Sequence, residues 1–193
     1  MNIIPMCFSF EVSVITFIIS WGISLYLLRK KLTTQQKYSI ISLMIFSSMQ
    51  IADAILWYIG MKKNNINYIV TSVLIPTILS LQILYNVFIV NNNGNPFITL
   101  LTVCSCIYLF IRFNGYSKSL CDNKLSSPIW GSNELKLWEI CLFAAFIFWP
   151  NISKFVAVMF IIIPLIHIFV GGSYGSLWCA ISTGLAFKYL YEY

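Results

Sequence analysis

The sequence predicts an all-α membrane protein: a bundle of seven transmembrane helices with its N-terminus outside and its C-terminus inside. Of the 193 residues, 59% are apolar and only 9% are charged, whereas a water-soluble domain carries roughly 25% charged residues. The apolar residues form continuous runs, which is typical of membrane helices and not of barrel strands, where apolar and polar residues alternate. Short polar or basic segments separate the runs. Soluble, fibrous and disordered classes are therefore excluded.

A helix needs about 20 residues to cross a hydrocarbon core about 30 Å thick. Runs of about this length predict spans near 9–28, 38–60, 67–90, 96–112, 135–150, 153–171 and 173–190. Together they form a single transmembrane domain over residues 1–193. The one long connection is a polar outer loop over 113–134.

Charged, Asn-rich and Pro- or Gly-containing segments set the span boundaries. Arg29-Lys30-Lys31 ends the first span, and Lys62-Lys63 ends the second. The fourth span begins at Pro96, because proline is well tolerated in the first helical turn. Trp149-Pro150-Asn151 separates the fifth and sixth spans, and Gly171-Gly172-Ser173 separates the sixth and seventh.

Basic residues in short loops predict the orientation, because such loops stay in the cytoplasm. The 29–37 loop has the densest cluster, and placing it inside puts the N-terminus outside. Some basic residues argue against this orientation, because it places them outside or at the outer boundary of the membrane: Lys62, Lys63, Arg112, Lys118, Lys124 and Lys136. The net charge of +6 is better explained by cytoplasmic retention and lipid headgroups than by nucleic acid. We therefore expect the lipid bilayer, and no nucleic acid, as a partner.

The second span carries an ionisable residue, Asp53, at membrane depth, where a charge costs about 2.5–3.5 kcal/mol. Gln50 precedes it by three residues and Trp57 follows by four. These spacings place all three on one helical face. We expect this stripe to face the bundle interior, with Asp53 as the central candidate for an ion or ligand site.

The predicted topology places Glu11, Asp53, Glu139 and His167 in the outer half of the membrane. These residues and Gln50 predict an outer polar vestibule or a cation or proton site. In the alternative interpretation, the two glutamates extend to the interface, Asp53 is hydrogen-bonded to a neighbour, and His167 is a packed interior residue. Both interpretations stay open at this point.

The third span offers Gln82 and Asn86, one turn apart on a single face, after Pro76. Carbonyl groups freed by the proline could line a cavity beside these amides. The simpler interpretation is hydrogen bonding between helices.

The seventh span carries small residues at every fourth position: Gly172, Ser176, Ala180 and Gly184. This spacing lets another helix approach closely. The face could seat a neighbouring helix of the same chain or a second copy in a homo-oligomer.

The six cysteines do not have metal-ligand spacing, and no metal or cofactor is expected. Cys7 and Cys121 share the predicted outer side, so a disulfide between them is one prediction and two unpaired thiols the other.

Three segments resemble an uncharacterised family of multi-pass membrane proteins from large DNA viruses and single-celled algae. They are the opening run 6–13, the stripe Gln50-x-x-Asp53-Ala54-x-x-Trp57, and Gly175-Ser176-Leu177-Trp178-Cys179. The resemblance implies a viral or algal membrane protein and brings no assigned chemistry.

Two functions are predicted. The first is a small transporter or channel for an ion, proton or solute, with Asp53 as its ionisable group. The second is a receptor-like or assembly protein without transport, whose polar residues serve packing, ligand binding or partner binding. An enzyme is disfavoured, because the sequence shows no nucleophile or metal arrangement.

Overall fold

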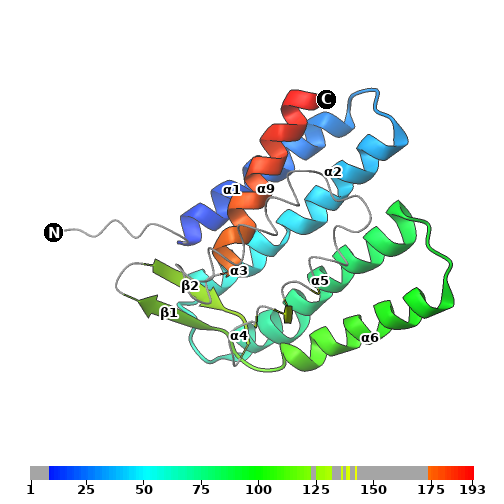
Figure 1. Ribbon diagram of the computed structural model, residues 1–193. Coiled ribbons are helices and arrows are strands. Elements are labelled where there is room, and N and C mark those ends of the chain that lie inside the picture. Colours follow the sequence, from blue (N-terminus) through cyan, green and yellow to red (C-terminus); the bar gives the residue numbers. More distant parts are fainter. Residues whose placement is uncertain (1–8, 123–124, 132–135, 137, 140–141, 143–173) are drawn as a thin grey trace.

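The computed structural model describes residues 9–122, 125–131, 136, 138–139, 142 and 174–193. Of 120–122, 125–127 and 174–180 only the backbone is described. The described chain is mostly helical, with one β-hairpin at an end of the helix bundle (Figure 1).

The first helix, α1 (Phe10–Leu28), begins at Ser9, whose hydroxyl accepts a hydrogen bond from the Val12 N–H. It ends just before the basic segment at Arg29. The next two helices, α2 (Thr34–Ser47) and α3 (Met49–Tyr58), are separated by a turn at Ser48. The Ser48 hydroxyl donates to the Met44 carbonyl at 2.8 Å, a type of bond that bends helices.

Gly60 ends α3 in a left-handed conformation, with φ +61°. The Gly60 N–H donates to the Trp57 carbonyl and the Met61 N–H to the Leu56 carbonyl. This pair of bonds is the Schellman motif, which favours glycine because a Cβ is strained there.

The third long helix runs over Asn65–Val90 and contains two π-helical segments. It consists of α4 (Asn65–Ile69), the π-helical η1 (Val70–Leu74), α5 (Ile75–Leu84) and the π-helical η2 (Tyr85–Val90). Pro76 has no N–H for the Ser72 carbonyl, and its ring would clash with that carbonyl in an α-helix. Instead, the Ile75 N–H donates to the Val70 carbonyl five residues back.

The remaining described elements are α6 (Pro96–Arg112), β1 (Lys118–Asp122), β2 (Leu125–Ile129) and α9 (Tyr174–Glu192). The Asn95 side chain caps α6 by accepting from the Phe97 N–H. β1 and β2 pair antiparallel, from Lys118 opposite Ile129 to Asp122 opposite Leu125.

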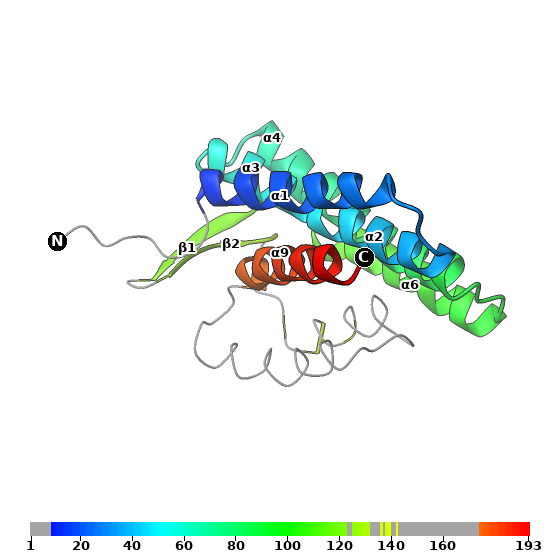
Figure 2. The same cartoon turned by 90° about the horizontal axis from the view of Figure 1, so that it is seen from above.

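Among the described elements, α1 packs against α2, α3 and α9, whereas α5 packs against α6 and α2 (Figure 2). The hairpin contacts α9 through β2. One apolar core, with Met49, Leu56, Ile75 and Trp130 among its members, lies between α3, the third long helix and the hairpin end. A second joins Leu43 and Phe46 of α2 to Ile181 and Leu185 of α9.

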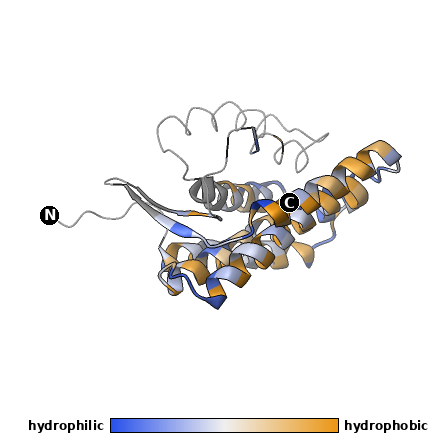
Figure 3. Cartoon of the chain, turned by 90° about the horizontal axis from the view of Figure 1, so that it is seen from below, coloured by the Kyte–Doolittle hydropathy of each residue, from blue (hydrophilic) through white to orange (hydrophobic). Residues whose placement is uncertain are grey.

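In α1, the buried face is polar and the exposed face is apolar, which is the reverse of a helix in a water-soluble protein. α1 buries Ser13, Ser20 and Ser24, whereas Ile15 and Ile18 are 55% and 60% exposed. Small polar residues between helices and apolar residues outside are typical of helices in lipid. Figure 3 shows that apolar residues run along much of the described helices.

Three described helices are long and apolar enough to cross a membrane: Phe10–Leu28, Thr34–Tyr58 and Asn65–Val90. They match the predicted spans 9–28, 38–60 and 67–90. The predicted span 96–112 matches α6, a shorter apolar helix. Membrane localisation is thus supported by helix length and composition, and the lipid bilayer is a compatible partner.

The structure gives less support to the three predicted spans nearest the C-terminus. The predicted span 173–190 coincides with α9, which is not among the three helices long and apolar enough to cross. Most of 135–150 and all of 153–171 lie outside the described residues. The count of seven and the orientation therefore stay predictions.

The all-α class needs one correction, because the predicted loop 113–134 contains the β1–β2 hairpin. The sequence signal is weak, since the strands are short and rich in serine and β2 contains Pro128. Proline cannot donate to a strand ladder and is tolerated on edge strands. Both strands of a two-stranded hairpin are edge strands, so proline is accommodated here.

Candidate functional site

Asp53 is buried in α3, with 2% of its surface exposed. Its Oδ1 accepts a hydrogen bond from the indole Nε1 of Trp130, the residue that follows β2, at 2.7 Å. The donor and acceptor are 77 residues apart in sequence. This bond therefore fixes the end of the hairpin to α3, near the C-terminal end of the second candidate span.

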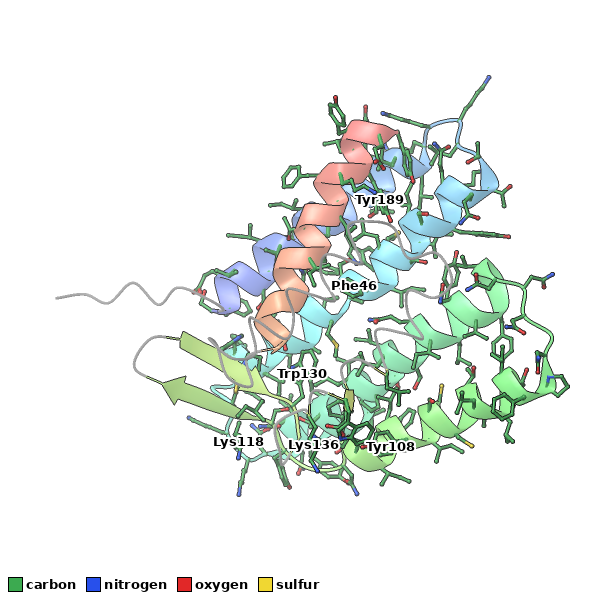
Figure 4. The ribbon with its side chains drawn as sticks, in the orientation of Figure 1. Phe46, Tyr108, Lys118, Trp130, Lys136 and Tyr189 are labelled. Carbon is green, nitrogen blue, oxygen red and sulfur yellow. The ribbon has the colours of Figure 1, made fainter. Side chains whose placement is uncertain are left out.

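Gly131 allows the chain to turn directly after Trp130. Its φ is +80°, and a Cβ there would lie 3.6 Å from the Arg112 carbonyl oxygen and from Phe113 Cα. The Phe113 ring meets the indole of Trp130 edge-on, with centroids 6.5 Å apart. Figure 4 shows Trp130 between the hairpin and α3.

The start of the hairpin is held by a second buried cluster. Asn67 of α4 donates through Nδ2 to the Ser117 carbonyl at 2.9 Å and accepts from the Ser117 N–H through Oδ1 at 2.8 Å. Thr71 of η1 also donates to Asn67 Oδ1, at 3.0 Å, and its hydroxyl lies 2.7 Å from that of Ser117. All three residues are at most 1% exposed.

Two further bonds complete this arrangement. Gly115 donates its N–H to the Ser72 hydroxyl at 3.0 Å, and Gly131 donates its N–H to the Ser117 hydroxyl at 3.4 Å. The second of these links the start of the hairpin to its end. We call Asp53, Asn67, Thr71, Ser117 and Trp130 the hairpin clamp.

Gln50, the second residue of the predicted stripe, is fully buried and donates from Nε2 to the Ser182 hydroxyl of α9. Its Oε1 and the Trp57 Nε1 are buried without a hydrogen-bond partner among the described residues. Gln50 also lines an apolar groove of about 360 Å³ between α1 and α3, with Phe10, Val14, Phe17, Ala54 and Tyr58 among the other lining residues.

Glu139 forms a separate cluster at the end of α6 and is 1% exposed. Arg112 donates to both carboxylate oxygens of Glu139, and the Tyr108 hydroxyl donates to Oε1 at 2.6 Å. The Lys136 backbone N–H donates to Oε2 at 2.7 Å. The Glu139 charge is thereby paired and hydrogen-bonded within the chain, as a buried carboxylate requires.

The other predicted site residues lie apart from Asp53. Glu11 is exposed in the first turn of α1. Gln82 and Asn86 line a small cavity of about 20 Å³ between α2 and the third long helix. His167 lies outside the described residues. The described part of the chain thus distributes the predicted vestibule residues over separate clusters.

The predicted small-residue face is only partly described. Gly184 is exposed, and a Cβ there would meet no atom within 4 Å. α9 instead buries Ile181, Ser182, Leu185 and Ala186. Gly172 and the side chains of Ser176 and Ala180 lie outside what the structure describes, so a contact with a second copy stays a prediction.

The predicted disulfide involves Cys7, which lies outside the described residues; Cys121 lies in β1 opposite Ser126. In the described part of the chain, no group of three or more His, Cys, Asp or Glu side chains is arranged to hold a metal ion.

Four residues of the hairpin clamp were not singled out from sequence: Asn67, Thr71, Ser117 and Trp130. A signal existed for two of them, because Asn67 and Thr71 are polar, four residues apart and at the start of an apolar span. Their spacing places both on one helical face. Ser117 and Trp130 lie in the loop, where sequence spacing does not indicate a partner.

No protein-family model, curated protein or solved structure matches the chain. The resemblance to the viral and algal membrane family therefore stays a prediction.

Proposed function

We propose that the protein is a receptor-like or assembly protein of the membrane, which presents the β1–β2 hairpin as a rigid recognition element. The observation that carries this proposal is the hairpin clamp, in which buried side chains of the helices hold both ends of the hairpin. A simple connecting loop needs no such anchoring. Loops that carry recognition are commonly positioned by a rigid scaffold.

The proposal gives Asp53 a structural role. Its carboxylate accepts the Trp130 indole N–H and lines neither the groove between α1 and α3 nor the cavity at Gln82. A buried polar group needs a partner to offset its lost hydration. Here each group supplies the partner of the other, and the hairpin is fixed as a result.

A small ion, proton or solute transporter is the second candidate. It is favoured by the position of Asp53 within a candidate span and by the absence of any ion pair to Asp53 among the described residues. An intramembrane carboxylate bonded to a neutral donor can exchange a proton or bind a cation when its partner moves.

One substitution separates the two functions. Asp53→Asn keeps an oxygen that can accept from Trp130 but removes the ionisable group, whereas Asp53→Leu removes both. The proposal predicts that ion and proton flux in proteoliposomes stays at the background of empty vesicles for wild type and both variants. Wild-type flux that Asp53→Asn abolishes, with folding unchanged, would establish the transporter instead.

We also propose the seven-span topology with the N-terminus outside. An odd number of spans is supported by the positions of the described helices, since α1 begins at the hairpin end of the bundle and α9 finishes at the opposite end (Figure 1). The orientation rests on the basic residues of the 29–37 loop. Single cysteines at Lys118 and Lys188 in intact vesicles provide the test. A membrane-impermeant thiol reagent added outside should label the first only, and labelling of both would contradict the topology.

A further inference from the structure

The small cavity between α2 and the third long helix is lined by two residues, Gln82 and Tyr85, whose side-chain polar atoms have no hydrogen-bond partner in the described part of the chain, unlike those of the hairpin clamp. Gln82 is 5% exposed, and both its Nε2 and its Oε1 are buried without a hydrogen-bond partner among the residues that the structure describes. Exchanging the oxygen and nitrogen of the amide would therefore not satisfy it. Tyr85 also lines the cavity, and its hydroxyl is likewise buried with no partner in the described segments.

The size of the cavity limits what it can hold. Its volume is about 20 Å³, and a single water requires about 10–15 Å³ measured in this way. A lipid chain or an organic solute is far larger. Water also needs two to four polar partners to remain in a buried site, and the Gln82 amide and Tyr85 hydroxyl supply one acceptor, one donor and one group of either kind.

The helix geometry explains why such a site exists here. Tyr85 and Asn86 begin the π-helical segment η2, in which the Asn91 N–H donates to the Asn86 carbonyl five residues back. π-helical turns often occur at functional sites. The opposite wall comes from α2, through Ser42, Ile45 and Phe46.

We propose that this cavity is a binding site for one water molecule, which hydrogen-bonds to the Gln82 amide and the Tyr85 hydroxyl within the third candidate span. The water joins α2 to the π-helical end of the third long helix. This site is independent of the hairpin clamp and of the function proposed above.

The direct test is a structure of the full chain in lipid nanodiscs, at a resolution that shows ordered waters. We expect one water peak within hydrogen-bond distance of Gln82 and Tyr85. An empty cavity, or density of an acyl chain, would overturn the proposal.

Thermal unfolding of Gln82→Met gives a second, independent test, because the two outcomes change the Tm in opposite directions. Methionine has a similar length and no amide. If water is bound, the substitution removes its partners and lowers the Tm; if the cavity is dry, it removes two unsatisfied atoms and raises the Tm.

Thr102→Val is the matched control. Thr102 is fully buried, its hydroxyl has no partner among the described residues, and it does not line this cavity. We expect its Tm to stay unchanged or rise. If the Tm of Gln82→Met rises together with that of the control, the result would count against bound water.

Discussion

The third long helix has a buried polar cluster at each of its two π-helical segments, and the two clusters differ in how their hydrogen bonds are satisfied. At η1, Thr71 and its neighbour Asn67 bond to one another and to Ser117 of the hairpin. Near η2, Gln82 and Tyr85 have three buried side-chain atoms without a hydrogen-bond partner within the described residues. The first cluster fixes a distant part of the chain, whereas the second leaves room for a small molecule.

This difference indicates that polar residues in a membrane span are not all evidence for transport. Asp53 and Asn67 are at most 2% exposed, yet each bonds to a residue that flanks the hairpin. Burial of a polar residue therefore does not identify its role, and the partner it finds is more informative.

The largest effect is expected for Asn67→Leu. This substitution removes bonds to the Lys62 carbonyl, Ser117 and Thr71. It leaves several buried polar groups unsatisfied, at about 1–3 kcal/mol for each. We expect a total loss of about 3–5 kcal/mol in the free energy of unfolding, measured by denaturation in detergent. A loss below about 1 kcal/mol would show that the clamp does not contribute to stability.

The second largest effect is expected for Asp53→Leu, which tests the other end of the hairpin. Asp53→Leu leaves the buried Trp130 indole N–H without its acceptor, and we expect a loss of about 2 kcal/mol. The matched variant Asp53→Asn retains an acceptor and should lose less than half as much. The same denaturation measurement applies, and equal losses in the two variants would show that the carboxylate charge, not the hydrogen bond, matters.

A substitution at Ser20 tests the reversed polarity of α1. Ser20 is fully buried, and the larger side chain of Ser20→Leu should overpack the interface, with a loss of about 1–3 kcal/mol. Ile18→Leu, on the exposed face of the same helix, should change the stability little. Comparable unfolding curves for the two variants would contradict the assignment of α1 faces.

The smallest effect is expected for Gly131→Ala. The residue has φ +80°, where a Cβ is strained, although the nearest atoms, at 3.6 Å, would make only ordinary van der Waals contact with it. We expect a loss of about 1–2 kcal/mol, with the helices retained by circular dichroism. Gly22→Ala is the control, because its Cβ would meet no atom within 4 Å. An effect as small as that of the control would show that the turn after Trp130 is not constrained.

The long helices could be predicted from sequence because length and apolar composition act locally: Phe10–Leu28 and Asn65–Val90 begin and end at caps and polar segments visible in the chain. The hairpin could not, because Pro128 and several serines weaken its strand pattern. The residues at its two ends bond to Asn67 and Asp53, which are distant in sequence.

In the candidate site, too, local helical spacing could be predicted from the sequence and long-range contacts could not. The stripe of Gln50, Asp53 and Trp57 follows from helical spacing, but its partners do not. Trp130 is 77 residues from Asp53, and Ser182 is 132 residues from Gln50. Likewise, the charge of Glu139 was apparent, whereas its pairing with Arg112 depends on how the chain returns to the end of α6.

Hydrogen exchange of the Trp130 indole N–H, followed by NMR, tests the central claim most directly. If Asp53 holds the hairpin through this group, exchange should be slow in wild type and in Asp53→Asn and much faster in Asp53→Leu. Fast exchange in the wild-type protein, or equal exchange in all three, would contradict the hairpin clamp.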